Sequence, residues 1–197
     1  LACHAIDGFA MPGADGAMRD LHVVPDKFQA SVHGQQSCVG CHTDITGIPH
    51  ETGGNIKVSC VQCHEDLWEA ATQANRTEEI AKLGHVKKQI DSYMKSIHAR
   101  PSRADQSNTN AACYDCHDAH YIAPGGSTER AAWRLDLPNV CGKCHAKELA
   151  DYATSVHGRE TLQNANPNAA ICSDCHTTHD VESPAMDATR LVITKNC

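Results

Sequence analysis

The stretch Cys172-Ser173-Asp174-Cys175-His176, with His157 before it and His179 after it, decides how this chain is interpreted. Two cysteines separated by two residues and followed directly by a histidine form the attachment pattern of a c-type haem. In that chemistry the two thiols bond covalently to the haem, and the adjacent histidine becomes the proximal ligand of the iron. We therefore expect a covalently bound haem at this stretch.

The same motif occurs four more times in the 197 residues: at Cys38, Cys41 and His42, at Cys60, Cys63 and His64, at Cys113, Cys116 and His117, and at Cys141, Cys144 and His145. Paired Cys-x-x-Cys groups also build zinc sites, and single ones form redox dithiols. Neither alternative, nor a disulfide framework, explains a histidine directly after every pair. The sequence therefore predicts five complete haem c sites.

Two further cysteines stand in incomplete motifs. Leu1-Ala2-Cys3-His4 lacks only the leading cysteine, and Cys197 is a candidate first residue of another motif. Joined head to tail, the two pieces form one complete motif. We expect a sixth haem held by Cys3 with His4 as its proximal ligand, and we expect Cys197 to carry a thioether bond or to lie beside another haem. Two explanations stay open: a window on a longer polypeptide, or one period of a tandem or polymeric arrangement.

Internal repeats group these motifs in pairs. Tyr93 to His98 matches Tyr152 to His157 at an offset of 59 residues, and the same offset carries Cys113 to His120 onto Cys172 to His179. A further match begins at Phe28. Each copy holds a first motif, an aromatic-led Ser-[Val/Ile]-His segment, a second motif and a trailing histidine. We predict three two-haem repeats, called copies 1, 2 and 3, over residues 1–55 (first motif incomplete), 56–125 and 126–197.

The repeat also selects a second histidine for each iron. The predicted proximal ligands are His4, His42, His64, His117, His145 and His176, and the predicted distal ligands are His33, His50, His98, His120, His157 and His179. Two strong axial ligands suit an electron carrier, so we expect bis-His ligation throughout. His22 and His85 lie outside this pattern, and each is either a surface histidine or a substitute for one distal ligand.

The composition indicates a core made largely of cofactor. Aromatic residues are only 4% of the chain, so bound porphyrins are expected to supply the missing apolar mass. The formal net charge of −7 argues against nucleic acid as a partner and favours basic ones. No apolar run is long enough to span a membrane. Because haem attachment of this kind takes place outside the cytoplasm, we expect a periplasmic or extracellular protein of a bacterium or archaeon, with any signal peptide removed.

The expected fold class is mostly irregular with some α-helix and little or no β structure, built around haems. Apolar residues at helical spacing predict one long helical region over Glu65 to His98, with Gly84 as a candidate interruption. A shorter helix is expected over Ala146 to Val156. Glu129 to Leu135 reads as one or two helical turns that end before Pro138.

At Ser155 to Gly158, Cys172 to His179 and Ile193 to Cys197 the chain resembles the multihaem cytochromes c with doubled C-x-x-C-H motifs. That group includes cytochrome c3-like carriers, octahaem reductases and outer-surface electron conduits. The resemblance implies closely stacked haems, low reduction potentials and a role in respiratory electron transfer, and it suggests that the chain is part of a longer one.

We expect an electron carrier in anaerobic or extracellular respiration, with redox proteins or extracellular acceptors as partners. One alternative is a multihaem reductase of a nitrogen or sulfur oxyanion. Such an enzyme needs an iron with an open distal side, often marked by a lysine in place of the motif histidine, and none of the five complete motifs has one. Another alternative is a subunit or repeat of a conductive cytochrome filament.

Overall fold

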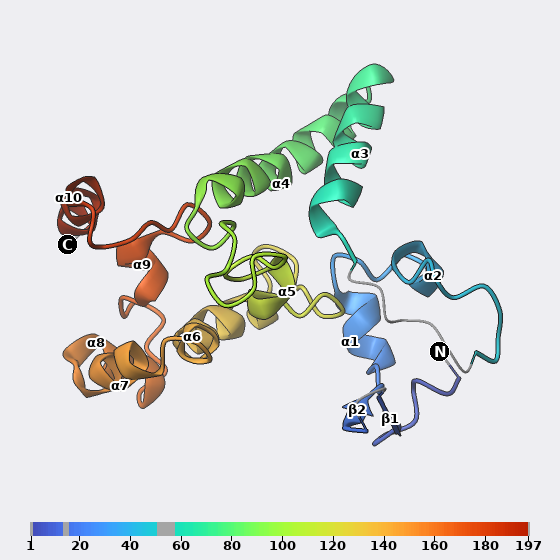
Figure 1. Cartoon of the computed structure of the whole chain (residues 1–197), viewed down its shortest axis with the longest axis horizontal. Helices are drawn as coiled ribbons and strands as arrows, with labels where there is room; N and C mark the ends of the chain where they lie inside the picture. The colour runs from blue at the N-terminus through green and yellow to red at the C-terminus, as the bar shows by residue number, and fades with distance from the viewer. Residues whose placement is uncertain (1, 14–15, 51–57, 197) are drawn as a thin grey trace. The chain divides into compact units, whose positions relative to one another are not determined.

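The computed structural model describes residues 2–13, 16–50 and 58–196 (Figure 1). In chain order the elements are β1 (Ala10–Pro12), β2 (Met18–Asp20), α1 (Pro25–Ala30), α2 (Cys38–Cys41), α3 (Cys60–Gln73), α4 (Thr77–Lys95), α5 (Cys113–Cys116), α6 (Thr128–Gly142), α7 (Ala146–Thr154), α8 (Val156–Leu162), α9 (Cys172–His176) and α10 (Asp187–Lys195). Cys197 and the predicted boundary at residues 55 and 56 lie outside the described residues.

The chain divides into two compact units, each built from segments far apart in the sequence. Unit 1 consists of residues 1–56 and 117–133, and unit 2 consists of residues 57–116 and 134–197. Unit 1 therefore combines copy 1 with the end of copy 2, residues 117–125, and the start of copy 3, residues 126–133. Unit 2 combines the rest of copy 2 with most of copy 3.

The expected fold class is confirmed, because the described residues are helical or irregular apart from one small sheet and an isolated β-bridge between Pro101 and Thr109. Strands β1 and β2 are three residues each and pair antiparallel, with Met11 opposite Arg19. The remaining elements are helices, several of them only one or two turns long.

The region from Glu65 to His98 is helical over most of its length, as predicted, but it is divided into α3 and α4 by a turn after Gln73. Asn75 has a φ of 51°, the left-handed conformation that asparagine tolerates better than most residues. Gly84, the candidate interruption, lies inside α4 instead. A Cβ there would stand 3.2 Å from the Trp68 ring of α3, so the glycine allows the two helices to approach closely.

Helix α6 is longer than predicted, since it continues through Pro138 to Gly142. A proline inside a helix removes one backbone hydrogen bond and normally destabilises it. Here Leu137 and Pro138 are both buried, and their packing offsets that loss. The helix expected from Ala146 is confirmed as α7.

Buried apolar side chains are few among the described residues, namely Ala71, Ile90, Leu137, Ala169 and Ile171. Large apolar side chains stay exposed beside the motifs and the predicted ligands, for example Val39 at 47%, Tyr114 at 46% and Val156 at 65%. Such surface is costly to leave in water, and a flat apolar cofactor would cover it.

Candidate functional site

The haem motifs are short helical turns. Three of them form α2, α5 and α9, a fourth begins α3, and Cys141 lies in the last turn of α6. Residues three apart on a helix lie on the same face, so both thiols of a motif can reach one edge of a cofactor. The backbone N–H of His42 donates to the carbonyl of Cys38 at 2.9 Å, and that of His145 donates to Cys141 at 3.0 Å.

The motif that begins α3 is the one continued by a long helix. The backbone N–H of Cys63 donates to the Ser59 carbonyl at 3.2 Å, which places Cys63 in the first turn, and Ser59 Oγ accepts from the N–H of Gln62 at 3.1 Å. The Cys63 side chain is exposed, whereas Cys60 is half-buried. The attachment of haem to Cys60 and Cys63 stays a prediction.

An aspartate stabilises the second motif of copies 2 and 3. Asp115 Oδ2 accepts from the backbone N–H of Ala112 at 2.7 Å, and Asp174 Oδ2 accepts from Ile171 at 2.8 Å. Each carboxylate thereby satisfies an N–H group at the start of the motif helix, where helices leave such donors without partners. The contact holds the cysteine pair in its helical turn.

The Ser-[Val/Ile]-His segments share one backbone geometry. Ser31, Ser96 and Ser155 have ψ angles of 164°, 164° and 167°, and their N–H groups donate to the residue three positions earlier. The tyrosine that leads the segment is also used alike. The Tyr93 hydroxyl donates to the Ala111 carbonyl at 2.8 Å, and the Tyr152 hydroxyl donates to the Ala170 carbonyl at 2.9 Å.

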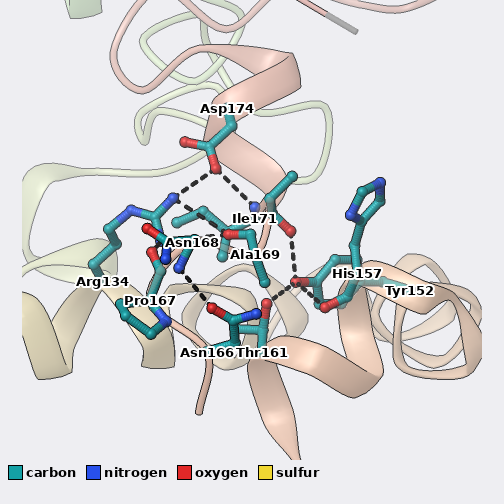
Figure 2. A network of polar contacts seen from close by, with 11 residues as sticks. Arg134, Tyr152, His157, Thr161, Asn166, Pro167, Asn168, Ala169, Ile171 and Asp174 are labelled. Carbon is teal, nitrogen blue, oxygen red and sulfur yellow. Dashed lines mark hydrogen bonds and ion pairs between the residues drawn. The ribbon is translucent and has the colours of Figure 1, made fainter. Parts of the chain in front are cut away.

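A polar network in unit 2 fixes α8 relative to α9 (Figure 2). The Tyr152 hydroxyl lies 2.8 Å from Thr161 Oγ1, and Thr161 is 3% exposed. Arg134 donates to Asp174 at 2.7 Å and to the Pro167 carbonyl at 3.2 Å. The chain between α8 and α9 is therefore held on both sides, which positions His157 and the motif of α9 within one local structure.

Three pairs of predicted axial histidines face each other. The ring centroids of His4 and His50 are 5.9 Å apart, and the ring planes differ by 11°. His42 and His120 are 6.2 Å apart, and His98 and His145 are 6.4 Å apart. Each pair joins one predicted proximal ligand with one predicted distal ligand.

These separations fit an iron between two imidazoles. A metal–imidazole bond is about 2 Å long and the ring centre lies about 1 Å beyond the nitrogen, so rings on opposite sides of one iron have centres about 6 Å apart. The measured centroid distances of 5.9 to 6.4 Å match this requirement. The donor set present is therefore suited to a six-coordinate haem iron.

The environment of these imidazoles also favours the form that binds metal. Burial lowers the pKa of His98, and the neighbouring His145 lowers it further. Burial likewise lowers the pKa of His120, assisted by His42 and His4 and opposed by Asp118. A lowered pKa keeps the ring neutral, and a neutral imidazole is the form that ligates a metal.

The first cysteines of neighbouring motifs touch one another. A hydrogen bond with Cys60, together with burial, raises the pKa of the Cys113 thiol. The Cys141 and Cys172 thiols are linked in the same way, which raises the pKa of Cys141 and lowers that of Cys172 to about 7. Two haem attachment points therefore adjoin at each of these places.

The remaining predicted ligands have varied surroundings. His33 Nδ1 lies 3.2 Å from the Ala119 carbonyl, and the His117 ring stacks on Trp133 at 5.4 Å. His64 and His179 are half-buried, whereas His157 and His176 are exposed.

The two histidines outside the repeat pattern differ in their surroundings. His22 Nδ1 is 3.8 Å from Asp7 Oδ1, and His85 is exposed on α4. Among the described residues, no predicted axial ligand stacks on either ring.

Sequence reasoning did not identify Trp133 as a residue of the site. Its ring stacks on His117 and also contacts the guanidinium of Arg130, which is 4.4 Å from the ring centroid. Trp133 has no counterpart in the repeat pattern. The only sequence signal for it is that the chain has just two tryptophans. Trp133 therefore packs against His117, a predicted proximal ligand, and makes a cation–π contact with Arg130.

Within the part of the chain that the structure describes, no group of three or more His, Cys, Asp or Glu side chains is arranged to hold a metal ion by itself. A haem iron needs only two protein ligands, because the porphyrin supplies the other four. In the same described ranges no helix has the length and apolar character to cross a bilayer.

Residues 59–135 match the family described as cytochrome c554 and c-prime. The matched stretch contains the complete motifs that begin at Cys60 and Cys113. No curated protein and no solved structure matches the chain. The family match supports a c-type cytochrome with covalently bound haem c that serves electron transfer, and such cytochromes are typically secreted or periplasmic.

Proposed function

We propose that this chain passes electrons along a series of closely spaced c-type haems, each ligated by two histidines, as in cytochromes with doubled C-x-x-C-H motifs. The observation that carries the proposal is the facing of proximal and distal histidines at 5.9 to 6.4 Å in three separate places. When bound, each haem supplies an iron that cycles between the ferric and ferrous states.

We assign ligands to individual motifs on the basis of the histidine pairs. His42 and His120 ligate the iron attached at Cys38 and Cys41, because His42 belongs to that motif. His145 and His98 ligate the iron attached at Cys141 and Cys144. The His4 and His50 pair serves the site to which Cys3 belongs.

Full ligation by protein side chains suits electron transfer. Two imidazoles would hold each haem iron, which would exclude substrates and keep the coordination unchanged between oxidation states. The protein's contribution is to fix spacing, exclude water and set potentials through burial and nearby charge. The lowered pKa values of His98 and His120, caused first by burial, are consistent with that role.

Contact between attachment points supports direct transfer between neighbours. Cys60 adjoins Cys113, and Cys141 adjoins Cys172, so the cofactors held by each pair of motifs would be adjacent. Each of these two contacts would form an element of two adjacent haems. A series of such elements would conduct electrons along its length. We place this chain in the periplasm or outside the cell, in anaerobic or extracellular respiration. The net charge of −7 favours basic redox partners.

The test combines the intact mass of the holoprotein with its spin state. We expect at least five covalently attached haems, low-spin spectra in both oxidation states and reversible reduction. A chain that matures normally but carries no haem would contradict the proposal. A high-spin component of one haem per chain that persists at every protein concentration would instead favour the reductase of a nitrogen or sulfur oxyanion.

A further inference from the structure

Trp133 and Arg130 form a stack on the imidazole of His117. The ring centroids of Trp133 and His117 are 5.4 Å apart and the ring planes differ by 17°, within the range of stacked aromatic pairs. The guanidinium carbon of Arg130 in turn lies 4.4 Å from the centroid of the Trp133 ring. A cation, an indole and a predicted proximal ligand are therefore in continuous contact, and all three belong to unit 1.

The first turn of α6 positions this stack. Ser127 Oγ accepts from the backbone N–H of Arg130 at 3.1 Å, and the Ser127 carbonyl accepts from Ala131 at 3.1 Å. Residues three apart on a helix lie on the same face, so one face of α6 carries both Arg130 and Trp133. Both side chains are half-buried, as is His117.

The positive charge of Arg130 is not cancelled by an ion pair. Arg76 pairs with Glu79, and Arg134 pairs with Asp174. For Arg130, by contrast, no carboxylate of the described residues lies within ion-pair distance. Because arginine stays protonated at every accessible pH, the charge beside the Trp133 ring is permanent.

The corresponding helix of the next copy lacks this stack. Helices α6 and α10 each begin eight residues after a trailing histidine, α6 after that of copy 2 and α10 after that of copy 3. At the repeat offset of 59 residues, Arg130 corresponds to Thr189 and Trp133 to Val192. The neighbouring Arg190 pairs with an aspartate of its own helix. The same haem motif thus has different surroundings in the two copies.

We propose that Trp133 and Arg130 are positioning residues that raise the reduction potential of the haem attached at Cys113 and Cys116. The inference rests on the proposed function, because it requires His117 to ligate that iron. A ferric iron held by a porphyrin dianion and two neutral imidazoles has one net positive charge, which a single electron neutralises. A second positive charge nearby therefore favours the reduced state.

The indole adds an effect of the same sign. A guanidinium next to an aromatic ring attracts its π electrons, and the polarised Trp133 ring makes the stacked His117 imidazole a poorer electron donor. A poorer donor stabilises ferric iron less, which also raises the potential. The stack further restricts rotation of the His117 ring about its bond to the iron.

The expected size follows from distance and screening. The two ring contacts and one metal–imidazole bond separate the guanidinium from the iron by about 13 Å at most. Allowing for solvent at the half-buried Arg130 side chain, we expect its charge to change the ratio of reduced to oxidised haem about three- to tenfold. For a one-electron couple, a tenfold change corresponds to about 59 mV.

The decisive variant is Arg130→Gln, measured by spectroscopic redox titration of the holoprotein. The potential of one haem should fall by the amount given above, and Arg130→Lys should retain part of the effect because it keeps the charge. The matched control is Arg76→Gln, which removes the same charge from an exposed position about 20 Å along α3 from its haem motif. The control should leave every potential unchanged.

Trp133→Leu tests the ring itself. It should lower the same potential, and it should shift the g values of one low-spin signal in electron paramagnetic resonance, since these values depend on the orientation of the axial imidazoles. Trp68→Leu is the control, because the Trp68 ring stacks on no predicted ligand among the described residues. The thermal transition of each variant reports whether it folds.

Two results would overturn the inference. One is an Arg130→Gln variant whose potentials all equal those of Arg76→Gln. The other is a shift that persists undiminished when Cys113 and Cys116 are both serine, because the affected haem would then be a different one. Failure of the proposed function would look different, as missing haems or missing low-spin spectra in the unmodified chain.

Discussion

Replacing His98 with alanine tests the assignment of ligands between copies. His98 lies in copy 2, yet its ring faces His145 at a centroid distance of 6.4 Å. We therefore expect His98→Ala to affect the haem attached at Cys141 and Cys144, 43 residues or more along the chain. The two haems of its own copy, at Cys60 and Cys63 and at Cys113 and Cys116, should keep their ligands.

The magnitude follows from the number of sites and from what the substitution removes. One of the five haems at complete motifs should lose its distal ligand, so about one fifth of the iron at these motifs should become high-spin. The backbone contact at this position survives, because the Ala111 N–H donates to the carbonyl of residue 98 at 3.0 Å. The variant should therefore fold, with a raised potential at one haem.

The assay is electron paramagnetic resonance and optical spectroscopy on the oxidised and reduced holoprotein. The matched control is His85→Ala, which removes an exposed imidazole from α4 in the same unit. A second background, in which Cys141 and Cys144 are both serine and that haem is lost, completes the test. There, His98→Ala should add no further high-spin signal, because its partner iron is already missing.

The reasoning is refuted if His98→Ala leaves the spectrum unchanged. It is also refuted if the high-spin signal persists undiminished in the background that lacks the haem at Cys141 and Cys144. The second result would show that His98 ligates a different iron. A signal from His85→Ala equal to that from His98→Ala would show that the repeat selected the wrong histidine.

Further predictions concern unit 1, the polar network and folding. His120→Ala should make the haem beside His42 high-spin, and an unchanged spectrum would contradict that pair. Tyr152→Phe leaves the buried Thr161 hydroxyl without its partner and should lower the free energy of unfolding by about 1–2 kcal/mol in denaturant titrations; no change would argue against the network. Gly158→Ala places a Cβ against the Tyr152 carbonyl and should lower the thermal midpoint, unless the backbone can adopt the form that accommodates Ala99 in copy 2. Expression without haem attachment should give a protease-sensitive chain, and a cooperative thermal transition in that material would disprove a haem-built core.

Secondary structure was only partly predictable from the sequence. The scarcity of strands and the helix from Ala146 follow from local composition and spacing, and both are confirmed for the described residues. The turn at Asn75 and the continuation of α6 through Pro138 were not foreseen. Both depend on packing: α3 folds back on α4 through Trp68 and Gly84, and burial of Pro138 compensates for a lost hydrogen bond.

The sequence by itself determined the chemistry of the sites, because haem attachment needs a contiguous motif. Cys172 to His176 carries its thiols and proximal ligand within five residues, so no tertiary information is required to recognise it. The repeat likewise singled out His98 and His157 as candidates for distal ligands. Neither pattern could state which iron each would reach, since a distal ligand has no fixed sequence distance from its motif.

Only the tertiary structure decided the partners. It brought His42 to His120 and His98 to His145, at sequence separations of 78 and 47 residues. It left His157 exposed. Such pairs form when backbone contacts such as that of Ile97 with Val181 dock one copy against the next. Identical repeats encode identical local turns, but which copy fills a neighbour's place is a property of long-range packing, where the free energy depends on the whole chain.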